Sequence, residues 1–185
     1  DGITNIPENL FNGCENLESV IIGNDVESIE KMAFYCCRSL ENLTIGNSVK
    51  SIGEDAFLSN DNLKSVVIPD SVESIGIYAF FRCISLEDLT IGKGVKSIGE
   101  KAFSECKALE SVIIPGNVET IGDSAFSYCE KLKTLTISEG VKYIGDMAFS
   151  SCQSLKSITI PDGIDSISYA AFSGCRKLES VTIPN

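Results

Sequence analysis

The stretch LKSVVIPDSVESIGIYAFFRC, residues 63–83, decides the fold because every part of it returns at one fixed spacing. Its Phe80 belongs to a series in which a phenylalanine recurs every 23 residues from Phe11 to Phe172, and Leu63 belongs to an equally regular series of leucines. Eight copies of the pattern fill the chain. We therefore interpret residues 1–185 as a single repeat array and not as several domains.

The first part of each copy has the pattern of a short half-buried strand. In residues 86–91, LEDLTI, Leu89 and Ile91 alternate with polar residues, so the two apolar side chains share one face. A turn rich in Pro, Gly, Asn and Asp follows and ends the strand. The next segment reads V-x-x-I-G, as in residues 95–99. We interpret it as a second short strand, although an irregular turn would fit the same two inward residues.

The last part of each copy, A-F-x-x-C, has the spacing of one helical turn. In residues 102–106, Ala102, Phe103 and Cys106 would share one side of such a turn, which is too short to be stable alone. Only stacking of neighbouring copies can bury these residues. The sequence therefore predicts an α/β solenoid of about eight coils, roughly 5 Å apart, with a parallel β-sheet on one face and short strands or helical turns on the other.

The combined pattern L-x-x-[VI]-x-I-P-x-x-V-x-x-I-G-x-x-A-F-x-x-C is clearest in residues 63–83 and 109–129. It resembles the BspA-like, or Treponema-type, leucine-rich repeats of bacterial surface proteins, over essentially the whole chain. The departures are local, such as Asn60 in place of cysteine. The resemblance implies a right-handed leucine-rich repeat solenoid, secreted by or displayed on anaerobic bacteria or mucosal protozoa. It also implies a role in adhesion to host proteins or in contacts between microbes, without catalytic residues.

The composition narrows the choice of partners. The chain carries 26 acidic and 15 basic residues, a formal net charge of −11, and this argues against nucleic acid or an anionic membrane as a partner. No apolar run is long enough for direct membrane insertion. We expect the chain to be part of a longer protein whose export signal, capping repeats and anchor lie outside it, at an extracellular or cell-surface location.

The cysteines follow the repeat, which argues against disulfides. Seven of the eight occupy one position of the coil, so their side chains point the same way and cannot adopt bridging geometry easily. We expect buried free thiols in this column, with Asn60 bonding backbone groups in place of a thiol. Cys36 lies outside the column, and we expect it to be the one reactive thiol. Without histidine or a C-x-x-C pair, the sequence predicts no metal site.

The absence of histidine also removes the usual general base and the Ser-His-Asp and Cys-His pairs. Carboxylate pairs such as Glu54 and Asp55 remain, but they occupy solvated turn positions where nothing raises a carboxyl pKa. We therefore predict no enzymatic activity and no cofactor.

Two faces of the predicted solenoid are candidate contact surfaces. The outward residues of the first strand are small and β-favouring, which is typical either of strand packing alone or of a flat surface for an extended protein or glycan. We expect these residues to form a continuous exposed sheet. The candidate contacts there are Asp88, Thr90, Ile113, Thr134 and Thr136. The second strand instead carries charges that alternate in sign from coil to coil, and we interpret them as stabilising the stack by about 0.2–1 kcal/mol per pair. These are Glu27, Lys50, Glu73, Lys96, Glu119, Lys142 and Asp165.

The second candidate surface is an apolar cluster on the side of the predicted helical turns. One copy of the repeat holds large apolar residues where the later copies hold serine and other polar residues. The members of the cluster are Met32, Tyr35, Leu58, Ile77, Tyr78, Phe81 and Ile84. Exposed, they would form a contact patch for a second copy or for another protein. Alternatively, Tyr78 packs on Phe81 and Ile77 on Ile84, and the cluster only thickens the core.

The sequence thus supports a non-enzymatic recognition or adhesion module whose partner is a host protein, a protein of a neighbouring cell or a second copy. Two other roles stay open, a structural spacer that binds nothing and an intracellular scaffold.

Overall fold

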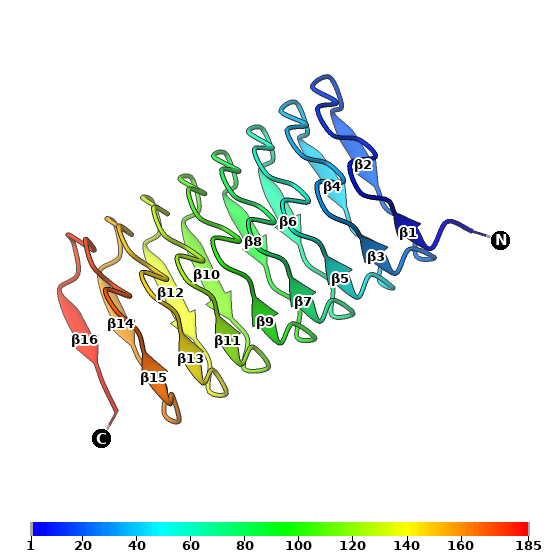
Figure 1. The fold of residues 1–185 in the computed structure, drawn as a ribbon. Helices are drawn as coiled ribbons and strands as arrows, with labels where there is room; N and C mark the ends of the chain where they lie inside the picture. The colour runs from blue at the N-terminus through cyan, green and yellow to red at the C-terminus, as the bar shows by residue number, and fades with distance from the viewer. Residues whose placement is uncertain (1, 185) are drawn as a thin grey trace.

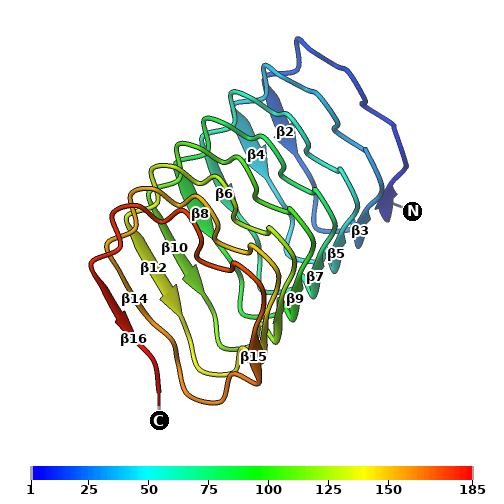
Figure 2. The ribbon, with the colours of Figure 1, turned by 60° about the vertical axis from the view of Figure 1, so that its left-hand side comes forward.

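The computed structural model describes residues 2–184 and shows one continuous stack of coils, with the two ends of the chain at opposite ends of the stack (Figure 1). Each coil contributes one longer strand and one two-residue strand. Figure 2 shows these two kinds of strand on different sides of every coil, with turn segments between them.

The longer strands are β2 (Ser19–Ile21), β4 (Asn42–Thr44), β6 (Ser65–Val67), β8 (Asp88–Thr90), β10 (Ser111–Ile114), β12 (Thr134–Ile137), β14 (Ser157–Thr159) and β16 (Ser180–Thr182). The short strands are β1 (Asn5–Ile6), β3 (Ser28–Ile29), β5 (Ser51–Ile52), β7 (Ser74–Ile75), β9 (Ser97–Ile98), β11 (Thr120–Ile121), β13 (Tyr143–Ile144) and β15 (Ser166–Ile167). The prediction that V-x-x-I-G forms a second strand is therefore confirmed.

The continuous sheet lies on the opposite side from the one that we expected. The short strands form a single eight-stranded parallel sheet in the order β1-β3-β5-β7-β9-β11-β13-β15, with Ile52 opposite Ile75 as a typical pair. The longer strands form four separate two-stranded sheets, β2-β4, β6-β8, β10-β12 and β14-β16. The expectation of a continuous sheet of longer strands is wrong.

The longer strands pair by twos through backbone hydrogen bonds near their ends. The N–H of Ile22 donates to the carbonyl of Thr44 within β2-β4, and the N–H of Ile68 donates to the carbonyl of Thr90 within β6-β8, each at 2.9 Å. A proline after the strand does not decide the pairing, since Pro184 follows β16 and this strand still pairs with β14.

The helical turns are also absent, because residues 2–184 contain no helix. Two positions in each coil have positive φ, as in Tyr78 (56°) and Arg82 (61°), and this left-handed conformation interrupts a right-handed helix. Alternate N–H groups of the segment bond to the next coil, for instance Phe80 to the carbonyl of Ala102 at 2.7 Å. The α/β description is therefore wrong in this part, and the structure is a parallel β-solenoid.

A column of phenylalanine rings runs through the core. The rings of Phe57 and Phe80 are stacked with their centroids 5.1 Å apart, and the other neighbours lie 5.1 to 5.4 Å apart. The ring of Phe80 is fully buried, as are Leu86 and Ala79 of the same coil. Each coil thus buries its apolar residues against its neighbours, and the predicted spacing of roughly 5 Å is confirmed.

Candidate protein-contact surfaces

The cysteine column lies inside the solenoid. All eight cysteines are free, and the column members from Cys37 onward are buried. Each buried thiol donates to the phenylalanine carbonyl of the preceding coil, as Cys83 does to Phe57 at 3.3 Å. Burial raises the pKa of the Cys83 thiol to about 12, so it stays protonated and unreactive at neutral pH. The prediction of buried free thiols is confirmed for these residues.

Asn60 replaces a thiol in this column. Its side chain is fully buried, and Nδ2 donates to the carbonyl of Phe34 at 3.0 Å, as we expected. Its Oδ1 has no hydrogen-bond partner in residues 2–184.

Two cysteines are accessible to solvent, since Cys36 is half-buried and Cys14 is exposed. Our assignment of Cys14 to the buried column is wrong, because no coil of the described chain stacks over it.

No group of three or more Asp, Glu or Cys residues within residues 2–184 is arranged to hold a metal ion. The same part of the chain contains no helix that is long and apolar enough to cross a membrane.

The side chains beside the eight-stranded sheet are engaged between coils. Lys50 and Glu27 form an ion pair at 2.6 Å, and Lys96 and Glu73 approach to 3.9 Å. Lys142 instead donates to the carbonyl of Gly163, at 3.1 Å. The alternating charges therefore link two of the predicted neighbouring pairs, and ion pairs this exposed to solvent contribute little to stability.

The turn side is engaged in the same way. Ser104 and Ser127 share a hydrogen bond at 2.8 Å, and Oδ1 of Asp123 accepts from the N–H of Asp146 at 2.8 Å. Most of the apolar cluster is folded down onto this side. Met32, Tyr35, Leu58, Tyr78 and Phe81 are half-buried, whereas Ile77 and Ile84 remain 43% and 39% exposed.

The centre of the apolar cluster is an aromatic pair. Tyr78 and Phe81 meet edge to face with their centroids 5.4 Å apart. Lys101 lies over the Tyr78 ring, 5.0 Å from its centroid, and donates to its hydroxyl at 2.9 Å. Tyr78 thus packs on Phe81, as expected if the cluster thickens the core. Within the cluster, only Ile77 and Ile84 then offer a large apolar surface to a partner.

The outward side chains of the longer strands form the remaining surface, which we call the strand face. All five candidate contacts on it are exposed, namely Asp88, Thr90, Ile113, Thr134 and Thr136. Within residues 2–184, no outward side chain of these strands makes a hydrogen bond or an ion pair. This sets the strand face apart from the other two sides.

Two other exposed aliphatic residues of this face, Ile21 and Val67, were expected to point outward but were not among the five candidate contacts. Ile21 is 79% exposed, Val67 is 62% exposed and Ile113 is 64% exposed, and all three occupy the same position of their coils. The signal was present, because β-branched apolar residues alternate there with threonine from coil to coil. The three side chains lie on every second coil, about 10 Å apart.

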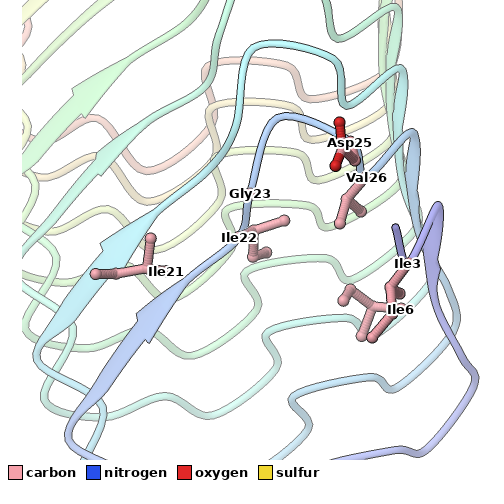
Figure 3. A pocket seen from close by; sticks show the side chains of 7 residues that line it. All are labelled: Ile3, Ile6, Ile21, Ile22, Gly23, Asp25 and Val26. Atoms are coloured by element: carbon pink, nitrogen blue, oxygen red, sulfur yellow. The ribbon is translucent and has the colours of Figure 1, made fainter. Parts of the chain in front are cut away.

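Two hollows lie at the edges of these surfaces. A polar hollow of about 390 Å³, between β8 and β10, is lined by Glu87, Asp88, Ala108, Glu110, Ser111 and Lys131. An apolar hollow of about 310 Å³ lies at the first coil, where Ile3 and Ile6 approach Val26 (Figure 3). Between inner coils a neighbouring coil fills the equivalent space, so the apolar hollow is a feature of the end of the array.

The model of the BspA-type leucine-rich repeat region matches residues 1–110 and 73–185, in six copies. The chain belongs to this family. The assignment agrees with the stacked coils and the buried column of phenylalanines, and it accounts for the full length of the array. No curated protein matches the sequence.

Solved structures of bacterial leucine-rich repeat proteins have the same fold as this BspA-type array. One from Bacteroides ovatus is 30% identical with a TM-score of 0.76, over 99% of this chain and 53% of its own. The leucine-rich repeat protein of Treponema pallidum is 29% identical with a TM-score of 0.76, over 86% of this chain and 72% of its own. A third structure, from Eubacterium ventriosum, is 23% identical with a TM-score of 0.64, over 99% of this chain and 71% of its own. The chain thus spans about half the length of the Bacteroides ovatus protein.

Proposed function

We propose that this array is a non-enzymatic protein-recognition module of a secreted or cell-surface protein, and that it binds its partner through the strand face. The family assignment supports a repeat protein of the bacterial surface type. The array as a whole is proposed to be one continuous unit of a longer protein, since its Bacteroides ovatus relative is about twice as long.

The observation that carries the proposal is the contrast between the three sides of the coil. Side chains beside the eight-stranded sheet and on the turn side bond from coil to coil, as Lys50 does with Glu27. Side chains of the strand face make no such bonds, yet they include Ile21, Val67 and Ile113, all more than 60% exposed. An ordered face that holds exposed aliphatic residues, and whose outward side chains make no bonds between coils, is suited to contact with a partner.

The energy available from these residues is sufficient for a specific contact. Burying one exposed isoleucine or valine contributes about 1.5–3 kcal/mol, before the loss of translational and rotational freedom is counted. Three such residues in one column therefore provide the apolar centre of an interface, and the surrounding serine and threonine residues provide a polar rim.

A catalytic role has no comparable support. The chain has no histidine, and the carboxylates that line the hollow between β8 and β10 are on the surface, with Glu87, Asp88 and Glu110 all exposed. Exposed carboxylates with no histidine beside them lack the enclosed cleft in which general acid–base catalysis usually takes place.

A spacer with no ligand of its own is the competing function, and an intracellular scaffold is the third. Binding to cells separates the first two. Fluorescent particles coated with the 185-residue chain would be offered to human epithelial cells and to bacterial cells, and bound particles counted by flow cytometry. We expect binding to at least one cell type.

The decisive variants carry three lysines each. The first variant alters the strand face and carries Thr90→Lys, Ile113→Lys and Thr136→Lys. The control alters exposed positions of the eight-stranded sheet and carries Thr120→Lys, Tyr143→Lys and Ser166→Lys. The proposal expects the first variant to lose binding and the control to keep it. Particles that bind no better than uncoated particles would favour the spacer.

A further inference from the structure

We propose that the strand face of the first five coils binds a cationic segment of a partner protein, one whose Lys or Arg side chains alternate with apolar residues. This inference rests on the proposed function and adds the chemistry of the partner. The neutral and anionic alternatives are outcomes of the test below.

The charge on the strand face, taken together with the residue before each of its strands, is uneven along the array. In the first five coils, the outward strand residues and the residue before each longer strand include five carboxylates and one lysine, a net charge of −4. These residues are Glu18, Glu41, Lys64, Glu87, Asp88 and Glu110. The same positions in the last three coils hold Lys133, Lys156 and Glu179, a net charge of +1. All of these charged residues are exposed.

The exposed aliphatic residues follow the same division. Ile21, Val67 and Ile113 all lie in the first five coils, whereas Thr136 and Thr159 take the equivalent position farther along. Negative charge and apolar surface therefore coincide on one part of the face. A partner that complements both must carry positive charge together with apolar side chains.

The hollow between β8 and β10 is the place for one cationic side chain. Glu87 and Asp88 line it and make no ion pair within residues 2–184. Glu110 also lines it, but its hydrogen bond with Lys133 at 2.8 Å lowers the pKa of that carboxyl. Lys131 reduces the negative charge at the rim. Two carboxylates therefore remain free to bind a guanidinium or ammonium group.

The position of the hollow links it to the apolar column. It opens at the start of β8 and β10, which do not pair, and Asp88 and Ser111 on its two sides belong to the same strands as Thr90 and Ile113. A Lys or Arg side chain in the hollow would place the neighbouring residues of its segment over Ile113, and the segment could continue along the array to Val67. Both contacts would be made at once by one segment.

The test is selection of random short peptides, displayed on phage, against the immobilised 185-residue chain. We expect the selected peptides to carry more Lys and Arg than the starting library, together with aliphatic or aromatic residues. Binding of one selected peptide, measured by fluorescence anisotropy, should weaken as the ionic strength rises.

Two matched variants locate the site. The first variant should bind the selected peptide about tenfold or more weakly, and it carries Glu87→Gln, Asp88→Asn and Glu110→Gln. Glu27→Gln, Glu73→Gln and Glu119→Gln remove the same charge beside the eight-stranded sheet, and should change the affinity less than about threefold. Circular dichroism of both variants checks that they remain folded.

Three results would overturn the inference. The first is that the selected peptides carry no excess of positive charge. The second is that both charge-neutralising variants lose peptide binding equally. The third is that the variant with Glu87→Gln, Asp88→Asn and Glu110→Gln binds the peptide as well as the parent chain does. If the strand-face lysine variant loses cell binding while the selected peptides show no positive charge, the recognition role stands and the cationic partner is rejected. If the coated particles bind no cells and no peptide is enriched, both proposals fail.

Discussion

Replacing Asn60 by cysteine should stabilise the solenoid. Asn60 is fully buried, its Nδ2 donates to the Phe34 carbonyl at 3.0 Å, and its Oδ1 has no partner in the described chain. A buried carbonyl oxygen without a hydrogen bond costs about 1–3 kcal/mol, whereas an ordinary hydrogen bond contributes about 0.5–1.5 kcal/mol. A thiol at this position would still donate to Phe34, as Cys83 donates to Phe57 at 3.3 Å.

The variant therefore exchanges one hydrogen bond for a weaker one and removes the unpaired oxygen. We expect a net gain of about 1 kcal/mol in the free energy of unfolding, which is a rise of about 2–4 °C in the melting temperature of a chain of this size. Urea denaturation followed by circular dichroism measures it. The control Asn60→Ala removes both groups and leaves Phe34 without a donor, so it should destabilise by about 1–3 kcal/mol. A loss of stability in the cysteine variant would show that Oδ1 has a partner, such as a buried water molecule, and would refute this reasoning.

Three further predictions concern single residues. Asp55 is buried, so the solvated position that we expected for it is wrong. Burial, followed by the charge of Glu54, raises the pKa of the Asp55 carboxyl, so Asp55→Asn should stabilise the protein by about 0.5 kcal/mol at neutral pH. Urea denaturation should show this gain disappearing as the pH falls through that raised pKa. Only Cys14 and Cys36 should react rapidly with a thiol reagent such as DTNB in the native protein, and fast labelling of more than two of the eight thiols would contradict the buried column. Ser151 has a φ of 61°, so Ser151→Gly should leave the melting temperature unchanged or raise it, in contrast to the loss of about 0.5–1 kcal/mol expected for Ser157→Gly within β14.

The repeat spacing was sufficient to predict the coils, both kinds of strand and the column of thiols. Each of these rests on side chains that recur in one phase, and stacking leaves a single arrangement that buries them. Asn60 could be assigned to the buried column for the same reason. The turns could not be predicted in this way, because A-F-x-x-C suits a helical turn and a series of tight turns equally well.

The sequence marks only a few of the left-handed residues that separate these two possibilities. Asn9, Gly13 and Gly174 occupy such positions in the first and last coils, but most inner coils hold residues such as Met32 or Tyr78, which do not favour a positive φ. The bonds between coils hold the backbone there, as Tyr78 N–H does with the carbonyl of Glu100 at 2.8 Å. That information depends on the neighbouring coil and not on the local sequence.

The break in the sheet of longer strands could not be predicted from the sequence. Proline follows β16 as it follows β6, β10 and β14, yet β16 pairs with the preceding longer strand and the other three do not. The outward positions of the longer strands follow from the alternation of residues, and the structure exposes all five candidate contacts among them, while their contact with a partner stays a prediction.

The most direct test of the account is the stability cost of substitutions on the strand face. Every outward residue of the longer strands would be replaced one at a time, by residues other than glycine and proline, on a display library, and unfolding measured by protease resistance, with the buried cysteine column as the reference. The account predicts changes within about 0.5 kcal/mol for the strand face, because its side chains make no bonds between coils, and losses of about 1–3 kcal/mol for the column. Losses of similar size at both sets of positions would show that the strand face is structural, and would contradict its assignment as the recognition surface.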